Sequence, residues 1–205
     1  MNAKKISDDD GIELVKMARK VITDYLKNDS KSNDSEFNSK FDFNSGVFVT
    51  LNKQNSLRGC IGYPLSDQKL SEGLVNAAIS AATRDPRFSP VDADELGEIV
   101  FEVTILSPPE EIKVQDPIEY LSIIKVGRDG LIVKNQYASG LLLPQVPTEY
   151  GWNEEEFLNH TCEKAGLDNN AWKDKTTKIS RFQGIVFKEV SPNGLVVRES
   201  SDDFL

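Results

Sequence analysis

The stretch Leu57–Tyr63 holds residue types that could do chemistry at close spacing. It reads Leu-Arg-Gly-Cys-Ile-Gly-Tyr, so a guanidinium group, a thiol and two glycines share one short segment. A cysteine reacts as its thiolate, and a nearby positive charge favours that form. If the stretch is an extended strand, its side chains alternate between two faces. One face then carries Arg58, Cys60 and Gly62, and the other carries Leu57, Gly59, Ile61 and Tyr63.

Cys60 is the candidate catalytic residue, and two interpretations of it stay open. In the first, Arg58 favours the thiolate, while Gly59 and Gly62 leave room for a ligand or another backbone segment. In the second, Cys60 is a small buried side chain and the glycines mark bulges. Residue type alone favours the second, because free cysteines are among the most buried residues. A catalytic cysteine normally needs a base, but the only histidine, His160, lies beside charged residues off the apolar stripe of its predicted helix, which indicates a surface residue.

Two further arginines bracket a loop that follows the next predicted helix. Arg84 and Arg87 enclose Asp85 and Pro86. If this loop faces the 57–63 stretch, the three arginines form a cationic site, and their forked guanidinium groups suit carboxylate or phosphate ligands. The competing interpretation, which the residue types favour, is that Asp85 and Asp92 pair with these arginines structurally. The candidate ligand-binding residues are therefore Leu57, Arg58, Gly59, Ile61, Gly62, Arg84 and Arg87.

Composition restricts the function classes. The chain has 205 residues, a formal net charge of −9 and two cysteines. An acidic surface repels phosphate backbones and anionic lipid, so we expect no nucleic-acid partner and no membrane partner. The sequence shows no apolar run near the roughly 20 residues of a membrane span and no secretion signal, which favours a cytoplasmic protein with reduced thiols. No metal-ligand spacing or cofactor motif is present, so we expect neither a metal nor a cofactor.

The predicted elements place the 57–63 stretch in a hairpin between two helices. Residue periodicity predicts helices at about 8–28, 67–82 and 153–165, and strands at about 47–51, 57–63, 99–106, 140–143 and 179–190. A second hairpin is predicted over 123–133, around an Asp-Gly turn. The Asn- and Ser-rich segment 28–40 reads as flexible, and the acidic tail 199–205 as loose. The order lacks regular β-α-β alternation, which indicates an α+β fold with a mostly antiparallel sheet flanked by helices.

At Leu57–Gly62 the sequence resembles the AMMECR domain family, which is named for a human syndrome-linked chromosomal region. The similarity covers about residues 8–190. It is carried by the 57–62 hexapeptide and by matching segments at 81–90, 102–108, 127–131, 142–146, 151–158 and 162–167. The motif matches without a substitution, and the Asn- and Ser-rich segment is where this chain is expected to differ.

The resemblance implies one domain over residues 1–205, built as two lobes, the second smaller, with the hexapeptide in a cleft between them. Relatives often occur beside, or fused to, a Memo-like protein and a radical S-adenosylmethionine enzyme. Chain length resembles the prokaryotic form. The family has no settled reaction, so the resemblance carries no activity over to this chain.

Two hypotheses about function remain. In the first, the chain is an enzyme or enzyme component that binds a small, anionic molecule, with Cys60 as nucleophile or contact and Arg58 orienting charge. In the second, it is a non-catalytic interaction module or scaffold, with Cys60 purely structural, that docks the radical S-adenosylmethionine enzyme or the Memo-like protein.

Overall fold

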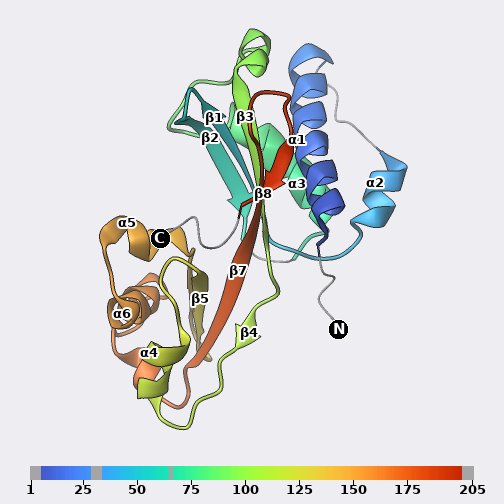
Figure 1. Cartoon of the computed structure of the whole chain (residues 1–205). Coiled ribbons are helices and arrows are strands. Elements are labelled where there is room, and N and C mark those ends of the chain that lie inside the picture. Colours follow the sequence, from blue (N-terminus) through green and yellow to red (C-terminus); the bar gives the residue numbers. More distant parts are fainter. Residues whose placement is uncertain (1–5, 29–33, 65–66, 200–205) are drawn as a thin grey trace. The chain divides into compact units, whose positions relative to one another are not determined.

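The computed structural model describes residues 6–28, 34–64 and 67–199 (Figure 1). The chain divides into two compact units, each with a core of its own. Within the described residues, unit 1 runs to Leu106 and resumes at Ile185, and unit 2 is the intervening Ser107–Gly184. Unit 2 is therefore an insertion within unit 1.

Unit 1 contains an antiparallel sheet with the 57–63 stretch at its edge. Its strands are β1 (Val47–Lys53), β2 (Ser56–Tyr63), β3 (Ile99–Leu106), the end of β7 (Lys178–Glu189) and β8 (Val196–Arg198). The order is β2-β1-β3-β7, and β8 also pairs with β7. β1 and β2 form the expected hairpin, closed by Gln54 and Asn55 with φ angles of 51° and 60°. Two successive left-handed residues make the turn type whose twist suits a hairpin.

Helices cover one face of this sheet (Figure 1). They are α1 (Asp8–Asn28) and α3 (Leu70–Thr83), while α2 (Ser35–Lys40) packs on α3 and the 3-10 helix η1 (Ala93–Gly97) contacts α1. α3 packs on β1 and β2, and α1 packs on α3 and β3. α3 has an alanine-rich stripe that is buried, and its small side chains let the helix approach the sheet closely.

The prediction of a flexible segment over 28–40 is wrong for its last residues, while 29–33 lie outside the described residues. Asp34 caps α2 by accepting a hydrogen bond from the Phe37 N–H at 3.1 Å. Phe37 is buried, and its ring lies 4.7 Å from that of Phe41. The burial of these two aromatic side chains therefore stabilises α2, although the segment is otherwise polar in composition.

A buried ion pair ties α1 to the end of β7. The Arg19 Nε donates to Glu189 Oε1 at 2.7 Å, and the guanidinium lies 4.1 Å from the Phe101 ring centre. Arg19 also donates to the Leu96 and Ile99 carbonyls, and Glu189 accepts from the Phe101 N–H. Both charges thus have several partners inside unit 1.

Unit 2 has a smaller sheet and a separate core. Its strands are β4 (Glu110–Glu111), β5 (Asp129–Lys134), β6 (Ser139–Leu142) and the start of β7, with β4 and β5 both paired to β7 and β6 paired to β5. Its helices are the 3-10 helix η2 (Pro117–Glu119), α4 (Tyr120–Ile123), α5 (Gln145–Tyr150), α6 (Glu154–Lys164) and the 3-10 helix η3 (Ala171–Lys173). Trp172, Phe157 and Cys162 lie in its core.

The prediction of a hairpin over 123–133 is wrong. β5 pairs with β6 instead, and residues 124–128 form a loop around the buried Asp129. Asp129 accepts hydrogen bonds from the Lys125 N–H, the Arg128 guanidinium and the Gln183 side chain. Asp129, which suggested a turn, is therefore a buried residue whose hydrogen bonds hold the 124–128 loop against β5 and β7.

The α+β class with mostly antiparallel pairing is confirmed. The other helices and strands largely match the expected positions, although α5 was not predicted. No helix within the described ranges is long and apolar enough to cross a membrane.

The α3 backbone lies close against β2 at Gly59. A Cβ atom at this position would lie 2.2 Å from the Ala81 carbonyl oxygen, whereas a Cβ at Gly97 would meet nothing within 4 Å. We predict that Gly59→Ala lowers the free energy of unfolding by about 3 kcal/mol, because the helix backbone must move. Gly97→Ala, the matched control, should stay within about 1 kcal/mol of the unmodified chain. Urea titration tests this, and equal effects of the two variants would contradict the packing argument.

Candidate functional site

Arg58 sits at a β-bulge, which changes the predicted faces of β2. Gly59 pairs with Leu51 and Leu57 pairs with Asn52, so Arg58 is an extra residue without a partner in β1. A bulge interrupts strand alternation. The prediction that Arg58 and Cys60 share a face is therefore wrong, because side-chain alternation holds only across a regular ladder.

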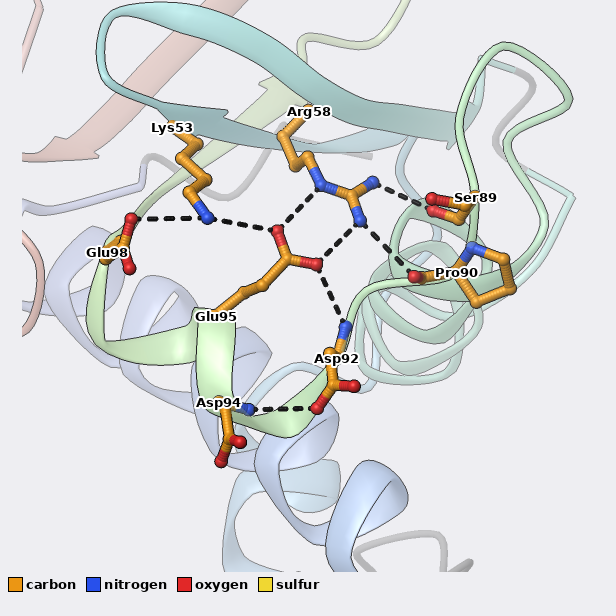
Figure 2. Close-up of polar contacts among 8 residues, drawn as sticks. All are labelled: Lys53, Arg58, Ser89, Pro90, Asp92, Asp94, Glu95 and Glu98. Atoms are coloured by element: carbon orange, nitrogen blue, oxygen red, sulfur yellow. Dashed lines mark hydrogen bonds and ion pairs between the residues drawn. The ribbon is translucent and has the colours of Figure 1, made fainter.

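The Arg58 side chain points to η1 and to the loop after α3 (Figure 2). Its Nε and Nη2 donate to the two carboxylate oxygens of Glu95 at 3.1 and 2.9 Å. Nη1 donates to the Ser89 carbonyl at 2.9 Å, and Nη2 also reaches the Pro90 carbonyl at 3.3 Å. Only 14% of the side chain is exposed. These contacts favour a structural role for Arg58, as a staple between the hairpin and the loop.

Glu95 is the carboxylate at the centre of this network. It also accepts from Lys53, which in turn pairs with Glu98, and from the Asp92 N–H in the capping box of η1 (Figure 2). The hydrogen bond from Arg58, together with the Asp92 N–H and Lys53, lowers the pKa of Glu95 to about 2 against the opposing effect of burial. The sequence led us to expect Asp92 as an arginine partner, but its side chain instead accepts from the Asp94 N–H.

Asp85 joins the arginine loop to β2. Its Oδ2 accepts from the Cys60 N–H at 2.9 Å and from Arg87 Nη2 at 2.7 Å, and its Oδ1 accepts from the Arg87 N–H and Nε at 3.1 and 3.0 Å. The residue is only 4% exposed. The Arg87 contact, above all, and the two backbone N–H groups hold the pKa of this carboxyl well below its usual range. The loop thus faces the strand, and the expected pairing of Asp85 with an arginine is observed.

Cys60 is half-buried and contacts Thr50, its cross-strand neighbour. The Thr50 hydroxyl donates to the Cys60 Sγ at 3.3 Å. Burial raises the pKa of the thiol, and the Glu102 and Asp85 charges add to this, while Thr50 and Arg87 oppose it. The guanidinium that acts on the thiol is therefore that of Arg87 rather than that of Arg58. The net direction indicates a neutral thiol at pH 7.

Thr50 and Glu102 are neighbours of Cys60 that the sequence analysis missed. Both follow from strand register, because Thr50 pairs with Cys60 on one side and with Glu102 on the other. The Thr50 hydroxyl also contacts the Glu102 carboxylate, whose pKa is raised by burial and by Glu199. Alternation within the predicted strands would have placed them on this face, but the hairpin register was needed to align them with the thiol.

The two glycines of the stretch make room for the protein itself. The position of a Gly59 side chain is occupied by the α3 backbone. At Gly62, a Cβ would lie 2.2 Å from Cδ1 of Phe48, the cross-strand neighbour whose ring covers it. The sequence left open whether these glycines make room for a ligand or for another part of the chain. At both positions the space is taken by other residues of the protein.

The remaining predicted residues fall into different surroundings. Ile61 packs against the core of unit 1, and Leu57 is 40% exposed. Arg84 ends α3 and is exposed, and among the described residues no hydrogen bond or ion pair engages its side chain. Arg87 has 55% of its side chain exposed, and its Nη1 donates no hydrogen bond to any residue within the described ranges. These two arginines therefore retain donors that face solvent.

His160 belongs to unit 2. Its Nδ1 lies 2.7 Å from Glu163 Oε2, and its ring stacks on Trp152 at 3.9 Å. With 38% of the side chain exposed, it lies at the surface of its helix, as expected. Cys162 is fully buried in the same helix. Among residues 6–28, 34–64 and 67–199, no group of three or more His, Cys, Asp or Glu is arranged to hold a metal ion.

The site is thus a β-hairpin edge, clamped by two arginine–carboxylate pairs, in an α+β chain of two units. Residues 15–187 match the AMMECR1 family model, and the chain belongs to this family. This confirms the resemblance seen at Leu57–Gly62.

Similar proteins occur in archaea. A protein of Methanothermobacter thermautotrophicus is 48% identical over 190 residues, covering 92% of this chain and 99% of its own. A protein of Methanocaldococcus jannaschii is 49% identical over 196 residues, which cover 93% of this chain and 96% of that protein. The crystal structure of an uncharacterised protein from Pyrococcus horikoshii matches with a TM-score of 0.78 and 46% identity, over 95% of this chain and 98% of that one.

The low pKa of Glu95 makes part of the stability depend on pH. The folded-state pKa of about 2 lies below the ordinary value of 4.5. The ionised Glu95 carboxylate therefore contributes its full share of the free energy of unfolding above pH 4.5, and this share is lost as the pH falls towards 2. We predict that Glu95→Gln costs about 2 kcal/mol at pH 7 and less than half of that at pH 3. Urea titrations at both pH values measure the difference.

The control for this experiment is Glu98→Gln, which changes a carboxylate that also contacts Lys53 but is 55% exposed. It should cost no more than about 0.5 kcal/mol at pH 7. A Glu95→Gln penalty that stays constant between pH 7 and pH 3 would show that the Arg58–Glu95 charge contact does not carry the effect.

The neutral thiol of Cys60 should react slowly. We predict that iodoacetamide alkylates Cys60 in the folded chain at pH 7.5 at least about tenfold more slowly than in the urea-unfolded chain, because only the thiolate is nucleophilic. Peptide mass spectrometry separates Cys60 from Cys162, which is fully buried and serves as the internal control for folding. Faster alkylation of Cys60 in the folded chain would contradict the pKa direction.

Proposed function

We propose that this chain is a cytoplasmic binding protein that takes a small anionic ligand at the outer edge of β2, beside Arg84 and Arg87. The observation that carries the proposal is the Arg87 guanidinium, which a buried carboxylate fixes in place while more than half of the side chain stays exposed. A guanidinium held by one carboxylate keeps further N–H donors in a fixed orientation, which suits a second anion.

The strand edge supplies additional donors. The Cys60 N–H points away from β1, because it donates to Asp85, and Arg87 Nη2 approaches the Cys60 carbonyl at 3.4 Å. In an antiparallel pair, residues two apart point the same way, so the Gly62 N–H also points outward. It lies about 7 Å along the strand from that of Cys60. A ligand with two carboxylates would place one at the Gly62 N–H and the other at Arg87.

Cys60 acts as a neutral contact in this proposal. Its raised pKa and its engagement by Thr50 argue against a nucleophile at neutral pH. Arg58, Gly59 and Ile61 then shape the strand, and Leu57 extends its exposed surface. The family resemblance adds a radical S-adenosylmethionine enzyme and a Memo-like protein as candidate partners that would supply or receive the ligand.

The second candidate function is a non-catalytic interaction module with Cys60 purely structural. Two observations favour this module. Other residues of the chain occupy the space beside Gly59 and Gly62, and the Arg58 guanidinium is engaged by Glu95 and the Ser89 carbonyl, so these residues serve internal packing. Here β2 is an edge strand, and such strands accept an extended segment of a partner by strand addition. Co-purification of one of the two partner proteins with the chain, lost on Leu57→Asp, would favour this function.

Binding to the β2 edge can be tested with succinate and inorganic phosphate as probes, at constant ionic strength. We predict that succinate shifts the amide resonances of Gly62 and Arg87, and that Arg87→Lys weakens binding by about tenfold, since lysine lacks the forked donors. Arg84→Ala, which breaks no ion pair, should weaken it about threefold.

Arg128→Lys is the matched control, because Arg128 holds the buried Asp129 with the same two-point contact, at 3.0 and 2.7 Å. This variant should leave succinate binding unchanged. If neither probe shifts the Gly62 or Arg87 amides at 10 mM, on the order of a weak metabolite affinity, the ligand proposal fails. Equal losses in Arg87→Lys and Arg128→Lys would also count against it.

A further inference from the structure

Three aromatic rings are stacked on the surface of unit 2. The ring centres of Tyr150 and Trp152 lie 4.9 Å apart with 16° between their planes, and those of Trp152 and His160 lie 3.9 Å apart with 21°. Tyr150 ends α5, Trp152 belongs to the short connection that follows, and His160 lies on α6. We call these three residues the aromatic stack.

The backbone fixes the aromatic stack. Gly151 adopts a left-handed φ of 68°, and Trp152 donates its N–H to the Pro147 carbonyl at 2.9 Å, so the chain turns back sharply after α5. Asn153 then caps α6 with a complete capping box. The rings are consequently held by two helix ends.

Tyr150, at the exposed end of the aromatic stack, is not part of the core of unit 2. Tyr150 is 68% exposed, while Trp172 in the same unit is 1% exposed and has its indole N–H bonded to Asn159. One ring face of Tyr150 lies on Trp152, and most of the residue is open to water. Rigid exposed aromatic residues are typical anchors of binding surfaces.

Carboxylates border the aromatic stack. On α6, Glu156 lies four residues before His160 and Glu163 three residues after it, so both are neighbours on the same helix face. Glu163 is 52% exposed and contacts His160 Nδ1, and Glu149 next to Tyr150 is also exposed. Two cations accompany these carboxylates: Lys173, which is engaged by Glu155, and the exposed Lys164, four residues after His160 on α6. The surface therefore combines ring faces with negative charge.

We propose that the aromatic stack, with Glu156 and Glu163, docks an arginine-bearing basic segment of a partner protein. A guanidinium stacks on aromatic faces and pairs with carboxylates, and this surface presents ring faces and carboxylates to successive side chains of one segment. The net charge of −9 attracts such a segment. Nucleic acid could also stack on the rings, but its phosphates face repulsion from the same carboxylates.

The test uses the intact nitrogen-15-labelled chain and two hexapeptides of alternating glycine with arginine or with glutamate. We expect the arginine peptide to shift the amide resonances of Trp152 and His160 saturably, and the glutamate peptide to leave them unchanged. A single-stranded oligothymidylate of six nucleotides is titrated in parallel. Tighter binding of the oligonucleotide than of the arginine peptide would overturn the proposal.

Matched variants separate docking on the rings from general attraction to an acidic protein. Tyr150→Ala should weaken arginine-peptide binding about fivefold, whereas Tyr137→Ala removes an 87% exposed tyrosine elsewhere in unit 2 and should not change it. Glu163→Gln should weaken it about threefold, and Glu111→Gln, an equal change of charge at a site paired with Lys178, should have less effect. Unchanged affinity in Tyr150→Ala, or equal loss in each variant and its control, would overturn the proposal.

Discussion

The Asp85 carboxylate is the interaction on which the candidate site depends. β2 is an edge strand, so its outward backbone groups lack a neighbouring strand. Asp85 accepts from the Cys60 N–H and is itself held by Arg87, which joins the loop after α3 to the strand edge. A buried carboxylate without these donors would be strongly unfavourable. The position of Arg87, and hence the direction of its free donors, follows from this one contact.

The same device occurs in both units. In unit 1 a buried aspartate gathers backbone N–H groups and one arginine, and in unit 2 Asp129 does the same with the Lys125 N–H and Arg128. Each acid fixes an irregular loop against a strand, where regular hydrogen bonding ends. Carboxylates of the same unit thus pair with the guanidinium groups of Arg58, Arg87 and Arg128. Binding capacity rests on the donors left over, which explains why Arg58 and Arg87 differ despite their similar appearance in the sequence.

The sequence predicted most of the fold because helices and strands leave local periodic signals. The β1–β2 hairpin, the alanine stripe of α3 and the capped start of α6 all follow from short-range patterns. The site was predicted less well, because it depends on register and on distant partners. The bulge at Arg58 moves that residue away from Cys60, and Glu95, Thr50 and Glu102 reach the site only through tertiary contacts. Residue types do not specify such contacts.

The insertion of unit 2 within unit 1 sets an order for folding on the ribosome. Within the described residues unit 2 is one continuous stretch, so all residues of its core have been synthesised once Gly184 is added. Unit 1 needs β7 and β8, and the buried Arg19 receives its carboxylate partner only when Glu189 is made. At about 5–20 residues per second, this delay after Leu106 lasts on the order of ten seconds. Translation therefore supplies the whole core of unit 2 before Arg19 of unit 1 has its carboxylate partner.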